Sequence, residues 1–595
     1  TVSLVAVLIP LLFMGDVVGR LFREFAVTLG VAILFSAGVS LTLTPMMCGR
    51  LLGHAGKGGG NRFFRATQGF FDRTIAGYGR TLTVVLNHQV ATLLVALATV
   101  AASVVLYIIV PKGFFPVQDT GQLSGVTEAA PTVSFAAMAE RQQMLANALS
   151  DDPAVASVAS YIGVDGVNTS LNVGRVAVTL LPKNKRDADA TVVARRLEAK
   201  ARNITGITLT LQPVQDLTVD ARAGRAQYQY TLDTPSSAEL THWTPLFVRA
   251  LAGRPEVRNV ESNLNEGGLR LNVDIDRVAA ARYGVTPSAV DNILYDAFGQ
   301  RQISTMFTEL SQYRVVLGVA PDMAAGASAL DNIRLPGTSD SQVPLAAVAR
   351  VTQGTGPLVI NRQGQFPAAT VSFDVAPGHS LGDAVTAVNA VQAELKMPES
   401  IVGAFQGAAR AFMDSLRNEP LLILAALVTV YIVLGVMYES FIHPVTILST
   451  LPSAGIGGLW ALLLFHQDLG VMAVIGIILL IGIVKKNGIM MVDFALSAER
   501  EEGKPPREAI YEACLLRFRP IMMTTFAALL GALPLALGTG VGSELRRPLG
   551  IVIVGGLIVS QVLTLYTTPV IYLFFERLAR RRQDVPTGVI AEPRS

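Results

Sequence analysis

Long stretches without a charged side chain are the feature that most restricts the fold of this chain. A helix needs about 20 apolar residues to cross a lipid bilayer. Burying many such runs in a soluble core would demand a core larger than a 595-residue chain can form. Seven runs reach or approach the length of a span: Phe25 to Gly49, Val90 to Pro111, Pro420 to Tyr438, Ser440 to Gln467, Leu469 to Val484 and onward, Pro520 to Ser543, and Pro548 to Phe575.

An eighth run, Thr1 to Gly15, is short for a span, and we interpret it as a truncated helix rather than a core helix because the chain does not begin with Met. Eight spans would place both ends of the chain on one side. Basic residues gather in the connection 50–89, in the connection 497–519 and in the tail 577–595, so we assign these regions to the cytoplasm. The block 112–419 then faces outward.

The cytoplasmic connection contains an amphipathic segment at about 62–87. It carries Phe63, Phe64, Phe70, Phe71 and Ile75 among basic residues. This pattern is typical of an interfacial helix that lies on the membrane. The alternative is an ordinary connecting helix.

The outward block alternates strand-like and helix-like patterns. Strands at 123–128, 155–161, 175–181 and 207–212 and helices at 134–149 and 188–203 give the order βαββαβ of a ferredoxin-like subdomain. A second copy begins at 227–232, 237–252 and 257–262 and resumes at 368–375, 381–395 and 401–406. The motif P-x-V-x-x-V-x-S occurs at 153–160 and at 255–262, in the same position of each copy, which favours duplication.

These patterns predict an α-helical polytopic membrane domain with about 8 spans and an α+β outward domain of repeated ferredoxin-like subdomains. The predicted parts are membrane spans at 1–111 with the interfacial helix, an outward subdomain at 112–217, a second one at 218–265 and 356–410, an inserted lobe at 266–355, membrane spans at 411–576 and a cytoplasmic tail at 577–595. The lobe is either a docking element or a loop-rich packing element.

Charged and polar residues interrupt two of the apolar runs. Lys485, Lys486, Asn487 and Asp493 lie within Leu469–Leu496, and a lysine at the centre of a membrane helix costs about 3 kcal/mol. Lys486 and Asp493 are seven residues apart, too far for a tight pair, so Lys486 needs a carboxylate from another helix. Two interpretations of Lys486 remain: a static buried ion pair, and a proton or cation relay.

The following run opens with Arg517, Arg519 and Pro520 and continues to Thr524 and Thr525. Pro520 suits the first turn of a helix, so we expect the helix to begin there. Arg517 and Thr524 are seven apart and share one face. Arg517 is either part of the same relay or a cytoplasmic anchor that snorkels to the interface.

Several classes of function find no support in the sequence. The glycine-rich run 53–60 lacks the spacing of a phosphate-binding loop, the six His are scattered, and no G-x-S-x-G or Cys/His constellation occurs. The net charge of +3 is too small to indicate nucleic-acid binding. We therefore expect no enzyme, no metal and no cofactor, but a transporter driven by an ion gradient.

Three segments together resemble RND (resistance–nodulation–division) exporters: GIVKKNGIMMVDFA at 482–495, EACLLRFRPIMMTT at 512–525 and GSELRRPLG at 542–550. The opening residues 7–29 and the LTPMMC run at 43–48 look like the fifth and sixth spans of that family. The resemblance is closest to the Mdt type of multidrug subunit. It implies that the chain is the C-terminal two thirds of a twelve-span pump.

The resemblance also implies a proton relay. In the family, a lysine of the tenth span bridges two aspartates of the fourth, and an arginine and a threonine of the eleventh span complete the relay. The matching positions are Lys486, followed by Asn487, and Arg517 and Thr524. Lys485 and Asp493 are candidates adjacent to it, and Asp493 matches the acidic residue that ends the tenth span. The aspartate pair would lie upstream of residue 1.

The implied activity is proton-driven efflux of amphiphilic compounds and drugs by a trimer in the bacterial inner membrane, with its large domain in the periplasm. Implied partners are a periplasmic adaptor, an outer-membrane channel, homologous RND subunits and membrane lipid. The alternatives are a regulatory partner subunit that does not pump and a protein-export or lipid-handling relative.

One segment departs from the family pattern. Drug-pumping members line the deep pocket with several Phe, whereas the stretch Tyr161–Val178 has none. This stretch is the candidate substrate-binding region, and we expect no aromatic trap in it. Either a more polar substrate range or a subunit that carries protons but not drugs would fit.

Overall fold

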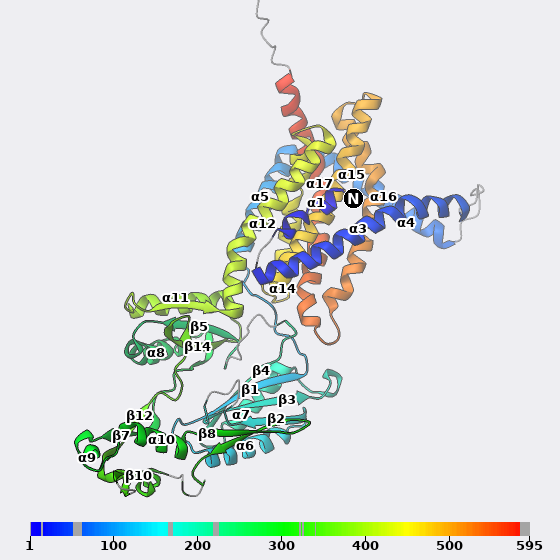
Figure 1. Cartoon of the computed structure of the whole chain (residues 1–595). Coiled ribbons are helices and arrows are strands. Elements are labelled where there is room, and N and C mark those ends of the chain that lie inside the picture. The colour runs from blue at the N-terminus through cyan, green and yellow to red at the C-terminus, as the bar shows by residue number, and fades with distance from the viewer. Residues whose placement is uncertain are drawn as a thin grey trace, which may run out of the picture.

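The computed structural model describes residues 2–13, 16–51, 62–164, 170–217, 225–320, 323, 326–338 and 341–583. Helices form a bundle at one end of the molecule, and three α/β lobes extend from the other end (Figure 1). The glycine-rich run 53–60, most of the tail 577–595 and residues 165–169 of the expected substrate segment lie outside the described residues.

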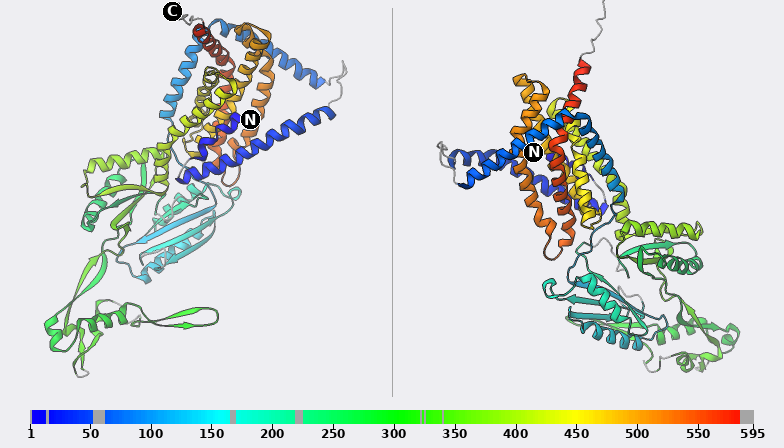
Figure 2. Two further views of the ribbon diagram at one scale, coloured as in Figure 1. Left: turned by 45° about the horizontal axis from the view of Figure 1, so that its top comes forward. Right: turned by 180° about the vertical axis from the view of Figure 1, so that it is seen from behind.

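The bundle combines long apolar helices from both halves of the chain (Figures 1 and 2). Its elements are α1 (Val2–Ala6), α2 (Ile9–Leu12), α3 (Asp16–Leu51), α4 (Arg62–Asn87), α5 (Gln89–Ile109), α12 (Gly407–Tyr438), α13 (His443–Leu448), α14 (Leu451–Leu464), α15 (Val471–Glu502), α16 (Pro506–Leu537) and α17 (Ser543–Gln583).

Among the described residues, seven helical segments are long and apolar enough to cross a membrane. They are Val18–Leu51, Gln89–Ile109, Pro420–Tyr438, His443–Leu464, Val471–Glu502, Pro506–Leu537 and Ser543–Leu578. Each overlaps one of the seven runs found in the sequence. The eighth run forms only short helices within Val2–Leu12, too short for a span.

The prediction that a helix begins at Pro520 is wrong, because α16 begins at Pro506 and continues through Pro520 to Leu537. Pro506 occupies the first turn, where a missing N–H costs nothing. Pro520 lies in the interior, and packing of α16 between α15 and α17 holds the helix together there. Arg517 and Thr524 therefore lie on one continuous helix, about 10 Å apart along its axis.

Helix α4 covers the segment expected to lie at the membrane interface, and it is anchored to the bundle. The Tyr78 hydroxyl donates a 2.8 Å hydrogen bond to the Leu565 carbonyl, and its ring stacks on Phe518 at 4.9 Å. The Arg519 guanidinium lies 5.3 Å from the ring centre of Phe71. These contacts join α4 to α16 and α17.

The first α/β lobe consists of β1 (Gln122–Ala129), α6 (Phe135–Ser150), β2 (Val155–Ile162), β3 (Val173–Leu180), α7 (Ala190–Ala201) and β4 (Ile207–Pro213). The four strands pair in the order β2-β3-β1-β4, and every pair is antiparallel. Alternating residues of β1 and β3 point into a core shared with the two helices.

The second lobe repeats this order with different segments. It contains β5 (Tyr228–Asp233), α8 (Ser237–Ala252), β6 (Val257–Ser262), β14 (Phe366–Val375), α11 (Leu381–Leu395) and β15 (Val402–Gln406). Strand β14 pairs with β5 and β6, β5 pairs with β15, and the short β13 (Arg362–Gln363) joins the end of β14. The motif P-x-V-x-x-V-x-S runs into β2 in the first lobe and into β6 in the second.

The third lobe is inserted between β6 and β14. It contains β7 (Gly268–Ile275), α9 (Arg277–Arg282), α10 (Pro287–Phe298), β8 (Arg301–Phe307), β9 (Gln312–Leu317), β10 (Arg334–Pro336), β11 (Gln342–Pro344) and β12 (Ala349–Gly356). Strands β7 and β12 form an antiparallel ribbon that carries the lobe, and a small core of its own lies beneath α10. The β8–β9 hairpin extends away from this core (Figure 2).

Candidate functional site

Helix α15 turns three polar side chains in three different directions. Successive residues of a helix are about 100° apart, so Lys485, Lys486 and Asn487 face different neighbours. Lys485 is 1% exposed, and its ammonium donates a hydrogen bond to the backbone carbonyl of Ser3 in α1. Asn487 is buried on the side of α16 and α17.

Lys486 lies between these two faces and is exposed. Asp493, two turns further along α15, is exposed as well, so the shared face expected from their spacing is present. The structure thus places Lys486 on an open face of the bundle and buries Lys485. The family resemblance singled out Lys486 for the relay, but the contact of Lys485 with α1 could not be predicted from the sequence.

Three buried polar side chains form a hydrogen-bonded triangle across three helices. Thr525 of α16 donates a 2.6 Å hydrogen bond to the Oε1 atom of Gln561 in α17. The Nδ2 atom of Asn487 lies 3.2 Å from the same oxygen and 3.4 Å from the Thr525 hydroxyl. Thr525 and Gln561 were not predicted as site residues. The available signal was a lone amide within the apolar run 548–575.

Arg517 lies on α16 against α15 without a carboxylate partner among the described ion pairs. Its guanidinium carbon is 4.7 Å from the centre of the Phe494 ring. Its Nε atom is buried and has no hydrogen-bond partner among the residues that the structure describes. Thr524 donates a 3.1 Å hydrogen bond to the Ile521 carbonyl of its own helix. Lys486 and Arg517 thus lie on adjacent helices with N–H groups that make no hydrogen bond among the described residues.

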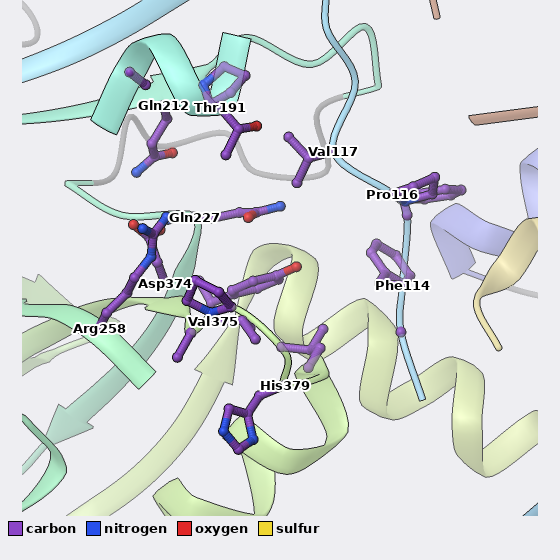
Figure 3. A pocket seen from close by; sticks show the side chains of 18 of the residues that line it. Phe114, Pro116, Val117, Thr191, Gln212, Gln227, Arg258, Asp374, Val375 and His379 are labelled. Atoms are coloured by element: carbon purple, nitrogen blue, oxygen red, sulfur yellow. The ribbon is translucent and has the colours of Figure 1, made fainter. Parts of the chain in front are cut away.

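A cavity of ≈ 370 Å³ lies between the first lobe, the second lobe and the bundle (Figure 3). Its lining mixes apolar side chains, among them Phe114, Phe115 and Val117 of the linker between α5 and β1, with polar and charged ones. Gln212 and Thr191 come from the first lobe, and Gln227, Arg258 and Asp374 from the second (Figure 3). Asp374 accepts hydrogen bonds of 2.9 Å from the Gln227 backbone N–H and the Asn259 side chain.

Two atoms at this cavity have no partner. The Nε atom of Arg258 and the Nε2 atom of Gln212 are buried without a hydrogen bond among the described residues. Beside Gln212, Glu198 accepts a 2.8 Å hydrogen bond from the Leu211 N–H. Burial raises the pKa of Glu198, and the neighbouring Asp374 carboxylate adds to this effect. The cavity can thus offer hydrogen-bond donors and a carboxyl group to a polar or cationic part of a solute.

The linker from α5 to β1, which lines one side of the cavity, hydrogen-bonds to the loop that begins α15. The Leu469 N–H donates to the Pro111 carbonyl at 2.8 Å, and the Val471 N–H donates to the Phe114 carbonyl at 3.1 Å. A side chain at Gly113 would meet the Asp468 carboxyl oxygen at 2.7 Å, so only glycine fits there. The same linker receives the Gly382 N–H of α11 at 3.0 Å, which ties the second lobe to this junction.

Asp468 is open to water on one side and packed against Gly113 on the other. The loss of water on the packed side raises its pKa to about 6, and the Asp383 carboxylate contributes in the same direction.

The expected substrate segment Tyr161–Val178 crosses β2 and β3, and its residues 165–169 are outside the described part. Tyr161 is exposed at the end of β2 and does not line the cavity described above. Among the described residues, no group of three or more His, Cys, Asp and Glu is arranged to hold a metal ion.

Comparison with known proteins gives a matching family and a similar solved structure. The sequence matches the AcrB/AcrD/AcrF family over residues 1–576. A solved structure described as the X-ray crystal structure of a heavy metal efflux pump superposes with a TM-score of 0.84 at 24% sequence identity. The match covers 97% of this chain and 58% of that chain, so the present chain spans little more than half the length of this structural relative. The chain therefore belongs to the AcrB/AcrD/AcrF family of RND transporters.

Proposed function

We propose that this chain forms part of a proton-driven RND efflux pump of the inner membrane that expels amphiphilic compounds. The observation that carries the proposal is a pair of cationic side chains on two adjacent helices: exposed Lys486 on α15, and Arg517 on α16, whose buried Nε atom has no hydrogen-bond partner among the described residues. Cationic side chains inside a membrane are costly, and they are retained where they bind or move ions.

The proton would bind carboxylates that neutralise Lys486. We propose that these carboxylates belong to a part of the pump that the chain does not include, since the chain spans 58% of the structural relative. Lys486 points to an open face, and Arg517 has an unused buried nitrogen. Thr524 lies two turns beyond Arg517 on the same helix. Protonation would release Lys486 from its carboxylate, and each charge that crosses 100 mV supplies about 2.3 kcal/mol.

Helix α15 would carry this change to the outward lobes. Lys486 lies 15 residues after Val471, which corresponds to about 22 Å of helix. Val471 is hydrogen-bonded to Phe114 of the linker, and the linker is bonded to α11 of the second lobe. A shift of α15 would therefore move the two lobes that border the cavity, and the cavity would change shape for a passing solute.

The remaining features of the proposal follow the family resemblance. We propose that the first and second lobes are duplicated ferredoxin-like subdomains that face the periplasm and that the third lobe docks an outer-membrane channel. An adaptor protein and related subunits, arranged as a homo- or heterotrimer of the Mdt type, would complete the assembly. Heavy-metal efflux is the described role of the structural relative. The mixed polar lining of the cavity favours amphiphilic organic solutes for this chain.

Loss of resistance tests the proposal. The complete gene, as wild type or with Lys486→Ala, is expressed in a strain that lacks its own efflux pumps. Ethidium accumulation and survival in deoxycholate are then measured. We expect the variant to accumulate ethidium like the empty strain at equal protein level. The matched control is Ser497→Ala, an exposed position three turns along the same helix, which we expect to pump normally. Full ethidium efflux in Lys486→Ala would refute the proposal.

A further inference from the structure

The triangle of Asn487, Thr525 and Gln561 includes the residues that directly follow Lys486 and Thr524, although the relay as described does not use Thr525 or Gln561. All three side chains are buried. Asn487 directly follows Lys486 in α15, and Thr525 directly follows Thr524 in α16. Gln561 is the member from α17, and its oxygen is the acceptor for both other side chains.

From this geometry we propose that Gln561 is a positioning residue of the proton relay, which sets the relative orientation of α15 and α16 through Asn487 and Thr525. The inference rests on the proposed function, because it assumes that Lys486 and Thr524 take part in proton transfer. Gln561 itself does not carry the proton, since an amide does not titrate.

The argument begins with the cost of an amide inside an apolar helix bundle. A buried polar group is destabilising unless its hydrogen bonds are satisfied. Gln561 satisfies both ends of its side chain, because its Nε2 atom donates to the Met522 sulfur at 3.3 Å while its oxygen accepts from Thr525 and Asn487. An apolar residue at this position would require none of these partners, so the packing of α17 alone does not account for a glutamine.

The second step is the direction that the triangle gives to its neighbours. A helix residue lies about 100° from the one before it, so fixing the direction of Asn487 also fixes that of Lys486. The same relation fixes Thr524 through Thr525. If α15 or α16 rotates during transport, the bonds of 3.2 Å and 2.6 Å to Gln561 must change. Gln561 thus biases the bundle toward one of its two arrangements.

The third step distinguishes Gln561 from an ordinary buried polar residue. Thr564 lies one turn away on α17 and is equally buried, but its hydroxyl faces Ser453 of α14 at 3.4 Å. It touches neither α15 nor α16 through a recorded hydrogen bond. Thr564 therefore provides a control that is also polar and buried on the same helix.

The test measures ethidium efflux as a function of external pH in cells that express the complete gene. Gln561→Met removes the acceptor at nearly constant volume, and Thr525→Val removes one donor. We expect each to lower the efflux rate about threefold to tenfold, as measured hydrogen bonds between membrane helices imply. We also expect each to shift the pH of half-maximal efflux, because the protonation equilibrium depends on the helix arrangement. Thr564→Val should change neither quantity.

Coupling between the two positions provides an independent readout. If Thr525 acts through Gln561, the double variant Thr525→Val/Gln561→Met should be no slower than the slower single variant. Should Gln561→Met fail to reach the membrane, Gln561→Glu keeps an acceptor oxygen for Thr525 and Asn487 and replaces the amide nitrogen by a titratable oxygen. We expect this variant to fold and to shift the pH of half-maximal efflux.

The outcomes separate this inference from the proposed function. An unshifted pH profile in Gln561→Met, or fully additive losses in the double variant, would overturn the positioning role while Lys486→Ala still abolishes efflux. Retained efflux in Lys486→Ala would instead overturn the relay, and the positioning role with it.

Discussion

The ammonium of Lys485 donates a hydrogen bond to the backbone carbonyl of Ser3, which joins helix α15 to helix α1. The adjacent Lys486 has no place in this contact and lies on the exposed face. Two lysines with the same side chain thus have different surroundings, and only the exposed one can meet a carboxylate from outside the described bundle.

This difference predicts opposite results for the two lysines. Lys485 is buried with a carbonyl, not a carboxylate, as its partner, and a cation in that setting is destabilising. Lys485→Met keeps the volume and removes the charge, so we expect a higher melting temperature in detergent and retained ethidium efflux. Nanoscale differential scanning fluorimetry and the efflux assay check both. A lower melting temperature together with lost efflux would place Lys485 in the relay instead.

The close approach of Gly113 to Asp468 predicts a coupling defect. A Cβ atom at position 113 would lie 2.6 Å from the Asp468 Cβ, so Gly113→Ala must displace the linker or the loop before α15. Overpacking of this kind costs about 1–3 kcal/mol. We expect reduced efflux with an intact helical bundle, measured by dye efflux and circular dichroism. Gly121→Ala, where a Cβ meets no atom within 4 Å but φ is +76°, controls for backbone strain alone.

Asp468 predicts a pH dependence of stability. Its pKa in the folded protein, about 6, is above the usual value of 3.8. The folded state therefore holds this proton more tightly than the unfolded chain. The free energy of unfolding falls as the pH rises through the window between 3.8 and about 6. Asp468→Asn is neutral throughout, so we expect its melting temperature to match wild type below the window and exceed it above pH 6. Equal melting temperatures on both sides would contradict the assignment.

Asp152 predicts the opposite dependence in the first lobe. Burial alone would raise its pKa, but the Ala154 N–H and the Arg196 guanidinium outweigh burial and lower it. Its stabilising effect is present above the usual pKa and is lost as the pH falls through the lowered value. Arg196 binds it through two bonds of 3.0 Å and 2.7 Å. We expect Asp152→Asn to cost about 2 kcal/mol.

The exposed Asp187, 2.9 Å from the same guanidinium, supplies the control for this pair. Asp187→Asn should cost under about 1 kcal/mol, because water screens an exposed ion pair. Thermal melting of the protein at neutral pH distinguishes the two substitutions. Equal losses would show that burial of Asp152 contributes nothing.

The positions of most elements could be predicted because their patterns are local. The strands expected at 155–161 and 207–212 form β2 and β4 within one residue at each end. In β4, apolar and polar residues alternate over Ile207–Leu211, and a period of two identifies a half-buried strand. The repeated order of elements in the second lobe followed from the motif shared by residues 153–160 and 255–262.

The unpredicted features depend on contacts between distant segments. Pro520 looked like a helix start because sequence shows the missing N–H but not the neighbouring helices that hold α16 together. Gln561 is 36 residues from Thr525 and 74 from Asn487, so no local pattern joins them. The hydrogen bond from Lys485 to the Ser3 carbonyl likewise joins residues 482 apart in the chain.

Proton movement coupled to solute movement tests the central claim most directly. The complete protein is reconstituted in liposomes with an imposed pH gradient, and collapse of the gradient is followed with a pH-sensitive dye on addition of ethidium. We predict that ethidium accelerates the collapse with wild-type protein and has no effect with Lys486→Ala. Acceleration of equal size in both proteins would contradict the account.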